Sequence, residues 1–245
     1  MILDGQHRIL ACALSNVPII LPLAIVPWSA YKDIDQNRNR SPQQMIDLPY
    51  ANQIAAIARH IIPALNGTTA TDFNATGREY ADQVIEIALG WPVFAEDQPW
   101  MREIFEAASA CGAAAGPLGG PVVSILASEE NGKASDEAQQ FLNGLRPLSR
   151  DVEYITIGET GKDPRRLLAK YTTREKNARR AGQPSSLGDS RATAAVIRHA
   201  VNIWMLRHTD NRIKTTMLSR WPDSRDLPPM WREEAVRAYH DQFVN

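Results

Sequence analysis

Apolar residues recur at helical spacing through most of this chain, and this periodicity is the strongest constraint on its fold. Within residues 51–65, for example, Ile54, Ile57 and Ile61 share one helical face, although Pro63 is unusual inside a helix. The same reasoning predicts further helices at residues 77–90, 98–114, about 120–129, 135–145, 163–181, 191–208 and 229–241. The chain is therefore expected to be mainly α.

The sequence of the first 48 residues predicts a small element that contains strands as well as a helix. Ile2 and Leu3 precede an Asp-Gly turn and are typical of the end of a strand, whereas "QHRILACALSN" (6–16) has a helical pattern. The apolar segment "PIILPLAIV" (18–26) follows as a buried strand, with Pro22 at an edge or a bulge. Strand, helix and strand in this order indicate a small N-terminal α/β element ahead of the helical region.

Charge is divided unevenly along the chain. Residues 1–161 carry a net charge of −9, whereas residues 162–220 carry +10, within a total of −1. Such asymmetry favours a polyanionic partner for the basic part, with docking of that part on the chain's own acidic half as the alternative. The predicted organisation is an α/β element, a helical region, a linker and a basic helical C-terminal region, at residues 1–48, 49–145, 146–162 and 163–245.

Membrane spans, disulfides and zinc sites are not expected. The longest apolar runs are too short to cross a bilayer, and Cys12 and Cys111 are far apart without metal-like spacing. The histidines form no ligand grouping, so no metal site is assigned, and His60 is expected to be partly buried. These observations predict a cytoplasmic protein that does not act at a membrane.

Two glycine-rich stretches carry no phosphate-loop prediction. Residues 158–162 ("GETGK") lack the first glycine of a P-loop and have Asp163 where Ser or Thr should follow. Residues 116–121 ("GPLGGP") are expected to form an interhelical turn.

The start of the chain has the features of a phosphate site. Asp4 and Gly5 permit a tight turn, after which Gln6, His7 and Arg8 present backbone N–H groups at a helix N-terminus, where the helix dipole attracts anions. Arginine also suits bidentate contact with phosphate. The alternative is that Asp4 only caps the helix and Arg8 pairs with a surface carboxylate.

The stretch "ILDGQHRILA" resembles the DGQHR motif of the ParB/sulfiredoxin-like superfamily, in which this turn cradles nucleotide phosphates. Gln6 stands where sulfiredoxins have their catalytic cysteine, so the resemblance does not imply sulfiredoxin chemistry. The order of elements is similar to phage and plasmid ParB-like proteins, some of which are labelled nucleases. Those relatives have strands and a helix ahead of the motif, so the domain is expected either to be shortened or to continue upstream. If it is shortened, its nucleotide affinity is expected to be weak.

A second element, "IDQNRNRS" (34–41), resembles the part of those relatives that carries an Asp, a Gly and basic residues. The resemblance implies that Arg38, Arg40 and Ser41 join residues 5–8 in binding phosphate. Ser41 also begins a well-formed helix start, because Pro42 suits the first helical position and Gln44 can complete a capping box.

The basic C-terminal region predicts a DNA-binding surface. Arg166, Lys170 and Arg174 recur every four residues, which places them on one helical face, and the helix at 191–208 adds further arginines beside a core stripe that includes Trp204. The expected DNA-binding residues are Lys162, Arg165, Arg166, Lys170, Arg174, Lys176, Arg179, Arg180, Arg191 and Arg198.

Three functions follow from these patterns. The first is DNA-associated binding by a ParB-like protein of phage or mobile-element type, with nucleotide or DNA phosphate at the Asp4–Arg8 turn. The second is a ParB-like nuclease, with Asp4, His7, Asp33 and Asp35 around a divalent ion such as Mg²⁺. The third is a non-catalytic module that binds a host protein through the acidic 67–161 region. A homo-oligomer is compatible with each.

Overall fold

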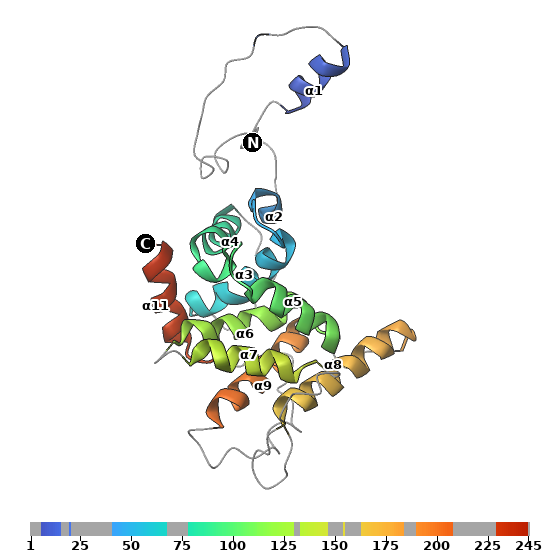
Figure 1. The fold of residues 1–245 in the computed structure, drawn as a ribbon, viewed down its shortest axis with the longest axis vertical. Coiled ribbons are helices and arrows are strands. Elements are labelled where there is room, and N and C mark those ends of the chain that lie inside the picture. Colours follow the sequence, from blue (N-terminus) through green and yellow to red (C-terminus); the bar gives the residue numbers. More distant parts are fainter. Residues whose placement is uncertain are drawn as a thin grey trace.

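The computed structural model describes residues 6–15, 20, 41–67, 78–129, 133–146, 154, 163–183, 190–207 and 229–244. Its helices are α1 (Gln6–Ser15), α2 (Pro42–Met45), α3 (Ala51–Leu65), α4 (Arg78–Gly90), the 3-10 turn η2 (Pro92–Phe94), α5 (Trp100–Cys111), α6 (Ala115–Ala127), α7 (Ala134–Gly144), α8 (Pro164–Arg180), α9 (Ser190–Leu206) and α11 (Glu233–Val244). No strand occurs among these residues, and the fold is mainly helical, as the periodicity predicts (Figure 1). Apart from the exposed Ile20, the two predicted strands lie outside the described residues.

Helix α6 is the centre of the bundle. All its residues from 116 to 125 are buried, and it contacts α3, α5, α7, α9 and α11. A helix with apolar residues on every side is stable only when neighbours cover it all round. The apolar composition of this segment therefore explains why the other helices pack around it (Figure 1).

The glycines of α6 correct one prediction from the sequence. Residues 116–121 do not form an interhelical turn, because they lie within α6 and are buried. A Cβ atom at Gly119 would overlap Cδ1 and Cγ1 of Ile57, and one at Gly116 would lie 3.0 Å from the Ala56 carbonyl oxygen. The glycines are thus required by the close approach of α3, not by a change of chain direction.

Helix α3 continues through Pro63 to Leu65. Proline has no N–H for the carbonyl four residues earlier, and its ring crowds that turn. Two arginines from other helices donate to carbonyls of this turn. Arg198 Nη2 donates to the His60 carbonyl at 2.8 Å, and Arg237 Nη1 donates to the Ala64 carbonyl at 3.0 Å. These bonds join α9 and α11 to the end of α3.

The hydrophobic core is shared across the predicted 146–162 linker. It contains Ile54 and Ile104 from one side, and Leu168, Trp204 and Val236 from the other. The helices of the two predicted regions therefore pack against one another. The prediction that Trp204 belongs to the core is confirmed, since its side chain is buried.

The described part of α1 contributes nothing to this core. Ile9, Leu10 and Leu14, which share one helical face, are exposed, and no residue of α1 belongs to the core cluster. Figure 1 shows α1 outside the bundle. The helix predicted after the Asp-Gly turn is present and begins at Gln6.

Candidate nucleic-acid interface

The basic helix α8 has well-defined ends. At its start, the Asp163 carboxylate accepts from the Arg165 backbone N–H at 2.8 Å, and Pro164 occupies the first helical position. At its end, Gly182 has a φ of 67°, Gln183 N–H donates to the Ala178 carbonyl, and Gly182 N–H donates to the Arg179 carbonyl. This is a Schellman arrangement. These two caps determine where α8 begins and ends.

One side of α8 is held by the C-terminus of α5. Thr172 Oγ1 donates to the Cys111 carbonyl at 2.6 Å, and Thr173 Oγ1 donates to the same oxygen at 3.2 Å. Lys176 Nζ lies 3.5 Å from the Ser109 carbonyl. Carbonyls in the last turn of a helix lack intrahelical partners, and the helix dipole favours a cation there. These contacts dock the middle of α8.

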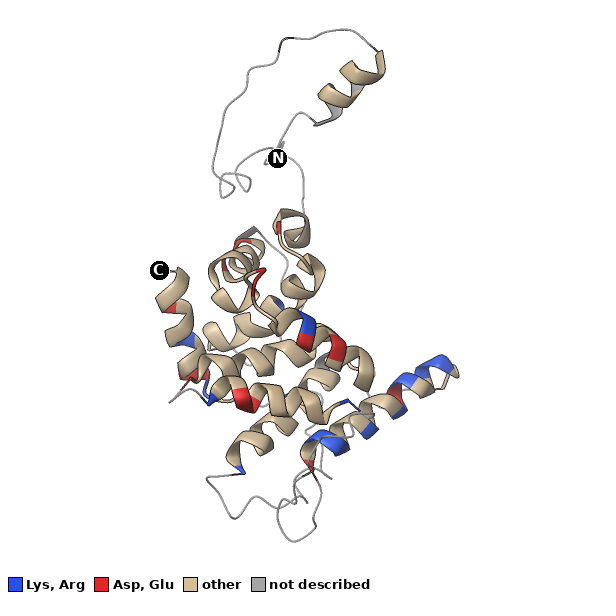
Figure 2. Cartoon of the chain, in the orientation of Figure 1, with Lys and Arg blue, Asp and Glu red and all other residues tan. Residues whose placement is uncertain are grey.

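The charged side chains that α8 exposes to solvent are all basic. Arg166, Lys170, Arg174, Arg179 and Arg180 are exposed and Lys176 is half-buried; we call these six residues the basic face. The acidic residue of α8, Glu175, is buried. Figure 2 shows this concentration of Lys and Arg along α8, whereas Asp and Glu occur mostly on the rest of the bundle. The sequence prediction that residues 166, 170 and 174 share an exposed face is in accord with this.

Most of the basic face is not neutralised by carboxylates. Within the described residues, Arg166, Lys170, Arg174 and Arg180 form no ion pair within 4.0 Å. Docking of these residues on the chain's own acidic half is thus not seen in this part of the structure. Their charge remains available at the surface.

Two arginines of the predicted DNA-binding set lie elsewhere. Arg165 and Arg198 are 2% and 3% exposed, and each donates a hydrogen bond to a carbonyl oxygen of another helix. Burial removes them from any surface that could touch phosphate, so their assignment to the interface is corrected. Lys162 lies outside the described residues. Arg191 belongs to α9, and its side chain is not among those described.

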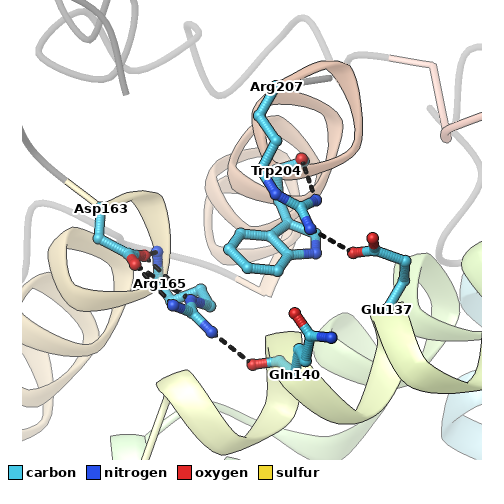
Figure 3. Close-up of polar contacts among 6 residues, drawn as sticks. All are labelled: Glu137, Gln140, Asp163, Arg165, Trp204 and Arg207. Carbon is cyan, nitrogen blue, oxygen red and sulfur yellow. Dashed lines mark hydrogen bonds and ion pairs between the residues drawn. The ribbon is translucent and has the colours of Figure 1, made fainter. Parts of the chain in front are cut away.

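Arg165 forms part of a buried ionic cluster that sequence reasoning missed (Figure 3). Its Nη2 donates to Asp163 Oδ2 at 2.7 Å, its Nη1 donates to the Gln140 carbonyl at 2.7 Å, and its guanidinium carbon lies 4.1 Å from the centre of the Trp204 ring. The three partners come from the start of α8, from α7 and from α9. Nothing in the spacing of the residues indicates these partners, because two of them are distant in sequence.

A second arginine covers the same indole. The guanidinium carbon of Arg207 lies 3.5 Å from the Trp204 ring centre, and its Nη2 donates to Glu137 Oε2 at 2.6 Å. Burial lowers the pKa of Arg207, and the Glu137 carboxylate opposes that change. Two guanidiniums and two carboxylates, Asp163 and Glu137, thus balance each other around Trp204. The cluster adds no net charge to the surface.

Arg198 and His60 form a second buried pair, in the core between α9 and α3. Burial lowers the pKa of Arg198 to about 10, and the Glu233 carboxylate opposes this change. Burial, with the Arg198 cation as a further cause, lowers the pKa of His60 to about 3. His60 is therefore neutral at pH 7, which agrees with the expectation of a buried histidine.

The predicted phosphate and catalytic residues of the N-terminal region are largely outside the described part. Asp4, Gly5, Asp33, Asp35, Arg38 and Arg40 fall there, and the side chains of Gln6, His7 and Arg8 are not described. Ser41 precedes α2 and its N–H donates to Gln44 Oε1 at 3.1 Å, which is half of the predicted capping box.

The described residues contain neither a candidate metal site nor a candidate transmembrane helix. No group of three or more His, Cys, Asp or Glu side chains is placed there to hold a metal ion. None of the described helices combines the length and the apolar character that a transmembrane span requires.

Comparison of the chain with protein-family models, with curated proteins and with solved structures finds no match.

Proposed function

We propose that this chain binds DNA through its phosphate backbone, with the basic face of α8 as the interface. The observation that carries the proposal is a helix whose exposed charged side chains are all positive. Counterion release makes a cluster of this kind a strong, sequence-independent site for nucleic acid. Because Lys and Arg contacts to phosphate carry no base information, the proposal concerns affinity and not sequence preference.

The dimensions of the basic face support contact with a row of phosphates. Arg166, Lys170 and Arg174 follow one another at about 6 Å along the helix axis, and Arg180 extends the row to about 21 Å. The helix also projects beyond the bundle at its C-terminal end (Figure 1). Arg179 lies on the same side of the helix as the buried Thr172, yet it is exposed. None of the exposed residues from 177 to 183 is acidic, so this end presents no carboxylate that would repel a duplex.

The resemblance at the N-terminus supports a more specific class, a ParB-like protein of phage or mobile-element type. In this proposal the Asp4–Arg8 turn binds a nucleotide or DNA phosphate. The start of α1 at Gln6 is compatible with that role, because it places backbone N–H groups directly after the turn. The proposal for this turn rests on the sequence alone.

A salt titration of binding to a random-sequence fluorescent duplex tests the DNA proposal. Log K is expected to fall linearly with log salt, and Lys170→Gln/Arg174→Gln should reduce the slope by about 2 and the affinity in 0.1 M salt roughly thirty- to a hundredfold. The matched control is Arg102→Gln/Lys133→Gln, which removes the same two charge types from exposed positions outside α8. This control should bind nearly as well as the wild type.

The same samples separate the alternatives. No binding by the wild type at 50 mM salt would overturn the DNA proposal and favour a protein partner for the acidic region. Equal losses in the two double variants would mean that net charge, rather than the basic face, determines binding. Cleavage that requires Mg²⁺ and is lost in Asp35→Ala would instead identify the nuclease; no observation in the described residues favours it.

A further inference from the structure

The direction of α8 depends on the contacts of its first turn as well as on those of its middle with α5. Its last turns project from the bundle, so their position depends on how the helix is held at the other end (Figure 1). From Arg166 to Arg180 the axis is about 21 Å long, and a tilt of about 10° at the start would move the far end by about 4 Å. A phosphate-binding row of this kind is useful only when the helix is held rigidly.

Arg165 is the side chain placed to hold it. It lies in a narrow slot made by Asp163, the Gln140 carbonyl and the Trp204 ring (Figure 3). Gly144, the last residue of α7, forms the fourth side of this slot. A Cβ atom there would lie 2.7 Å from Arg165 Cζ, too close for the guanidinium to remain in place. The slot therefore requires glycine at position 144 and a flat, forked cation at position 165.

The charge of Arg165 is not itself available to a ligand. The side chain is buried and paired with the equally buried Asp163. Its neighbour Arg166, one residue later, is exposed on the basic face. Arg165 therefore anchors the first turn of the helix, whereas Arg166 is exposed to solvent.

We infer that Arg165, seated between Gly144 and Trp204, is a positioning residue for phosphate binding, because it holds the first turn of α8 and, together with the α5 contacts of Thr172 and Thr173, sets the direction of the basic face. This inference rests on the proposed function. It predicts that affinity for DNA depends on residues of α7 and α8 that touch no phosphate. Loosening the slot should remove phosphate contacts without removing any charge from the basic face.

The test uses two matched glycine substitutions in the full chain. Gly144→Ala fills the slot, whereas Gly90→Ala places the same methyl group at the last residue of α4, where it meets Val244 of α11 instead. Each change replaces a helical glycine and should favour its own helix. Gly144→Ala is expected to lower the affinity for the random duplex roughly five- to tenfold in 0.1 M salt and the salt slope by about 1. Gly90→Ala should change neither.

Arg165→Lys and a distance measurement complete the test. Lysine keeps the charge but cannot reproduce the fork and the stacking, so it should behave like Gly144→Ala. Spin labels at the exposed Asn177 and Ser135, in a Cys12→Ser background, report the direction of α8 relative to α7 without DNA. Both slot variants should broaden this distance distribution, with circular dichroism showing that the bundle stays folded.

The outcomes distinguish the two proposals. Failure of the wild type to bind DNA overturns the proposed function and this inference with it. Wild-type binding with unchanged affinity, slope and label distances in both slot variants overturns this inference alone. Equal losses of DNA affinity in Gly144→Ala and Gly90→Ala would also overturn it, because the loss would then follow from any added methyl group at a helix end and not from the slot around Arg165.

Discussion

At the scale of the residue, His60 is the buried group whose protonation most directly opposes the fold. Its side chain is 6% exposed in α3, close to the Arg198 guanidinium. Burial disfavours a charged imidazole at this position, and a proton on His60 would in addition place a second cation beside Arg198. The folded protein therefore keeps this imidazole neutral far below the pH at which the unfolded chain takes up the proton.

This difference predicts a loss of stability in mild acid. The pKa of His60 is about 3 in the folded protein, against 6.5 for an ordinary histidine. The contribution is therefore complete above pH 6.5 and is lost as the pH falls from 6.5 towards 3. Between pH 7 and pH 5 the free energy of unfolding should fall by about 2 kcal/mol more in the wild type than in His60→Leu. Urea unfolding at both pH values measures it, and equal pH dependence in the two proteins would contradict it.

The basic residues show how far a sequence can assign roles to single side chains. Four-residue spacing correctly places Arg166, Lys170 and Arg174 on an exposed face, because helix geometry alone determines that grouping. The burial of Arg165 depends on Trp204 and Gly144, which are separated from it in the sequence and reach it only through the packing of α7 and α9. Such partners cannot be read from a local pattern.

At the scale of the element, the contact between α3 and α6 determines how closely the bundle is packed. Gly116, Gly119 and Gly120 of α6 bring its backbone against side chains and backbone of α3. Glycine in a helix costs about 1 kcal/mol relative to alanine. The close packing of the two helices offsets that cost, because dispersion attraction is strong only between atoms at van der Waals distance.

A double-mutant cycle tests this contact. Gly119→Ala should destabilise the protein by about 1–3 kcal/mol despite its better helix propensity, because the new methyl group overlaps Ile57. Ile57→Ala vacates that space, so its cost should be smaller in the Gly119→Ala background than in the wild type. Urea unfolding of the four proteins gives the coupling energy. Strictly additive effects would show that the helices are not in contact at this point.

The same helix explains the error in the sequence prediction. Regular amphipathic helices such as α3 and α4 are predicted within a residue or two, since each has one buried face. Helix α6 has no polar face, and its glycines and prolines imitate the composition of a turn. Where every side of a helix is buried, apolar and polar residues do not alternate at helical spacing, and the pattern cannot mark where the helix begins. The sequence therefore predicts a start near residue 120, whereas α6 begins at Ala115.

At the scale of the whole molecule, helices from both sides of the predicted linker share one core, to which α1 does not contribute. Helix α9, whose residues Val196, Val201 and Trp204 belong to the core, packs against α6, which lies on the other side of that linker. The change of charge at residue 162 therefore marks a change of surface, not a boundary between independent cores. Composition predicts where the charge changes, but it does not show which apolar faces are buried together.

This shared core makes a prediction for fragments of the chain. Residues 41–146 contain α2 to α7. They lack α9 and α11, which pack against α6 and α3, and they lack α8, which packs against α5 and α7. Without them, the apolar sides of α6 and α3 that α9 and α11 cover would be exposed to water, and the His60 carbonyl would lose its bond from Arg198. This fragment should therefore show no cooperative urea transition. Residues 41–245 should unfold in a single transition that coincides by circular dichroism and tryptophan fluorescence. A cooperative transition in the shorter fragment would instead establish residues 41–146 as an independent domain, with the basic helices as an attached layer.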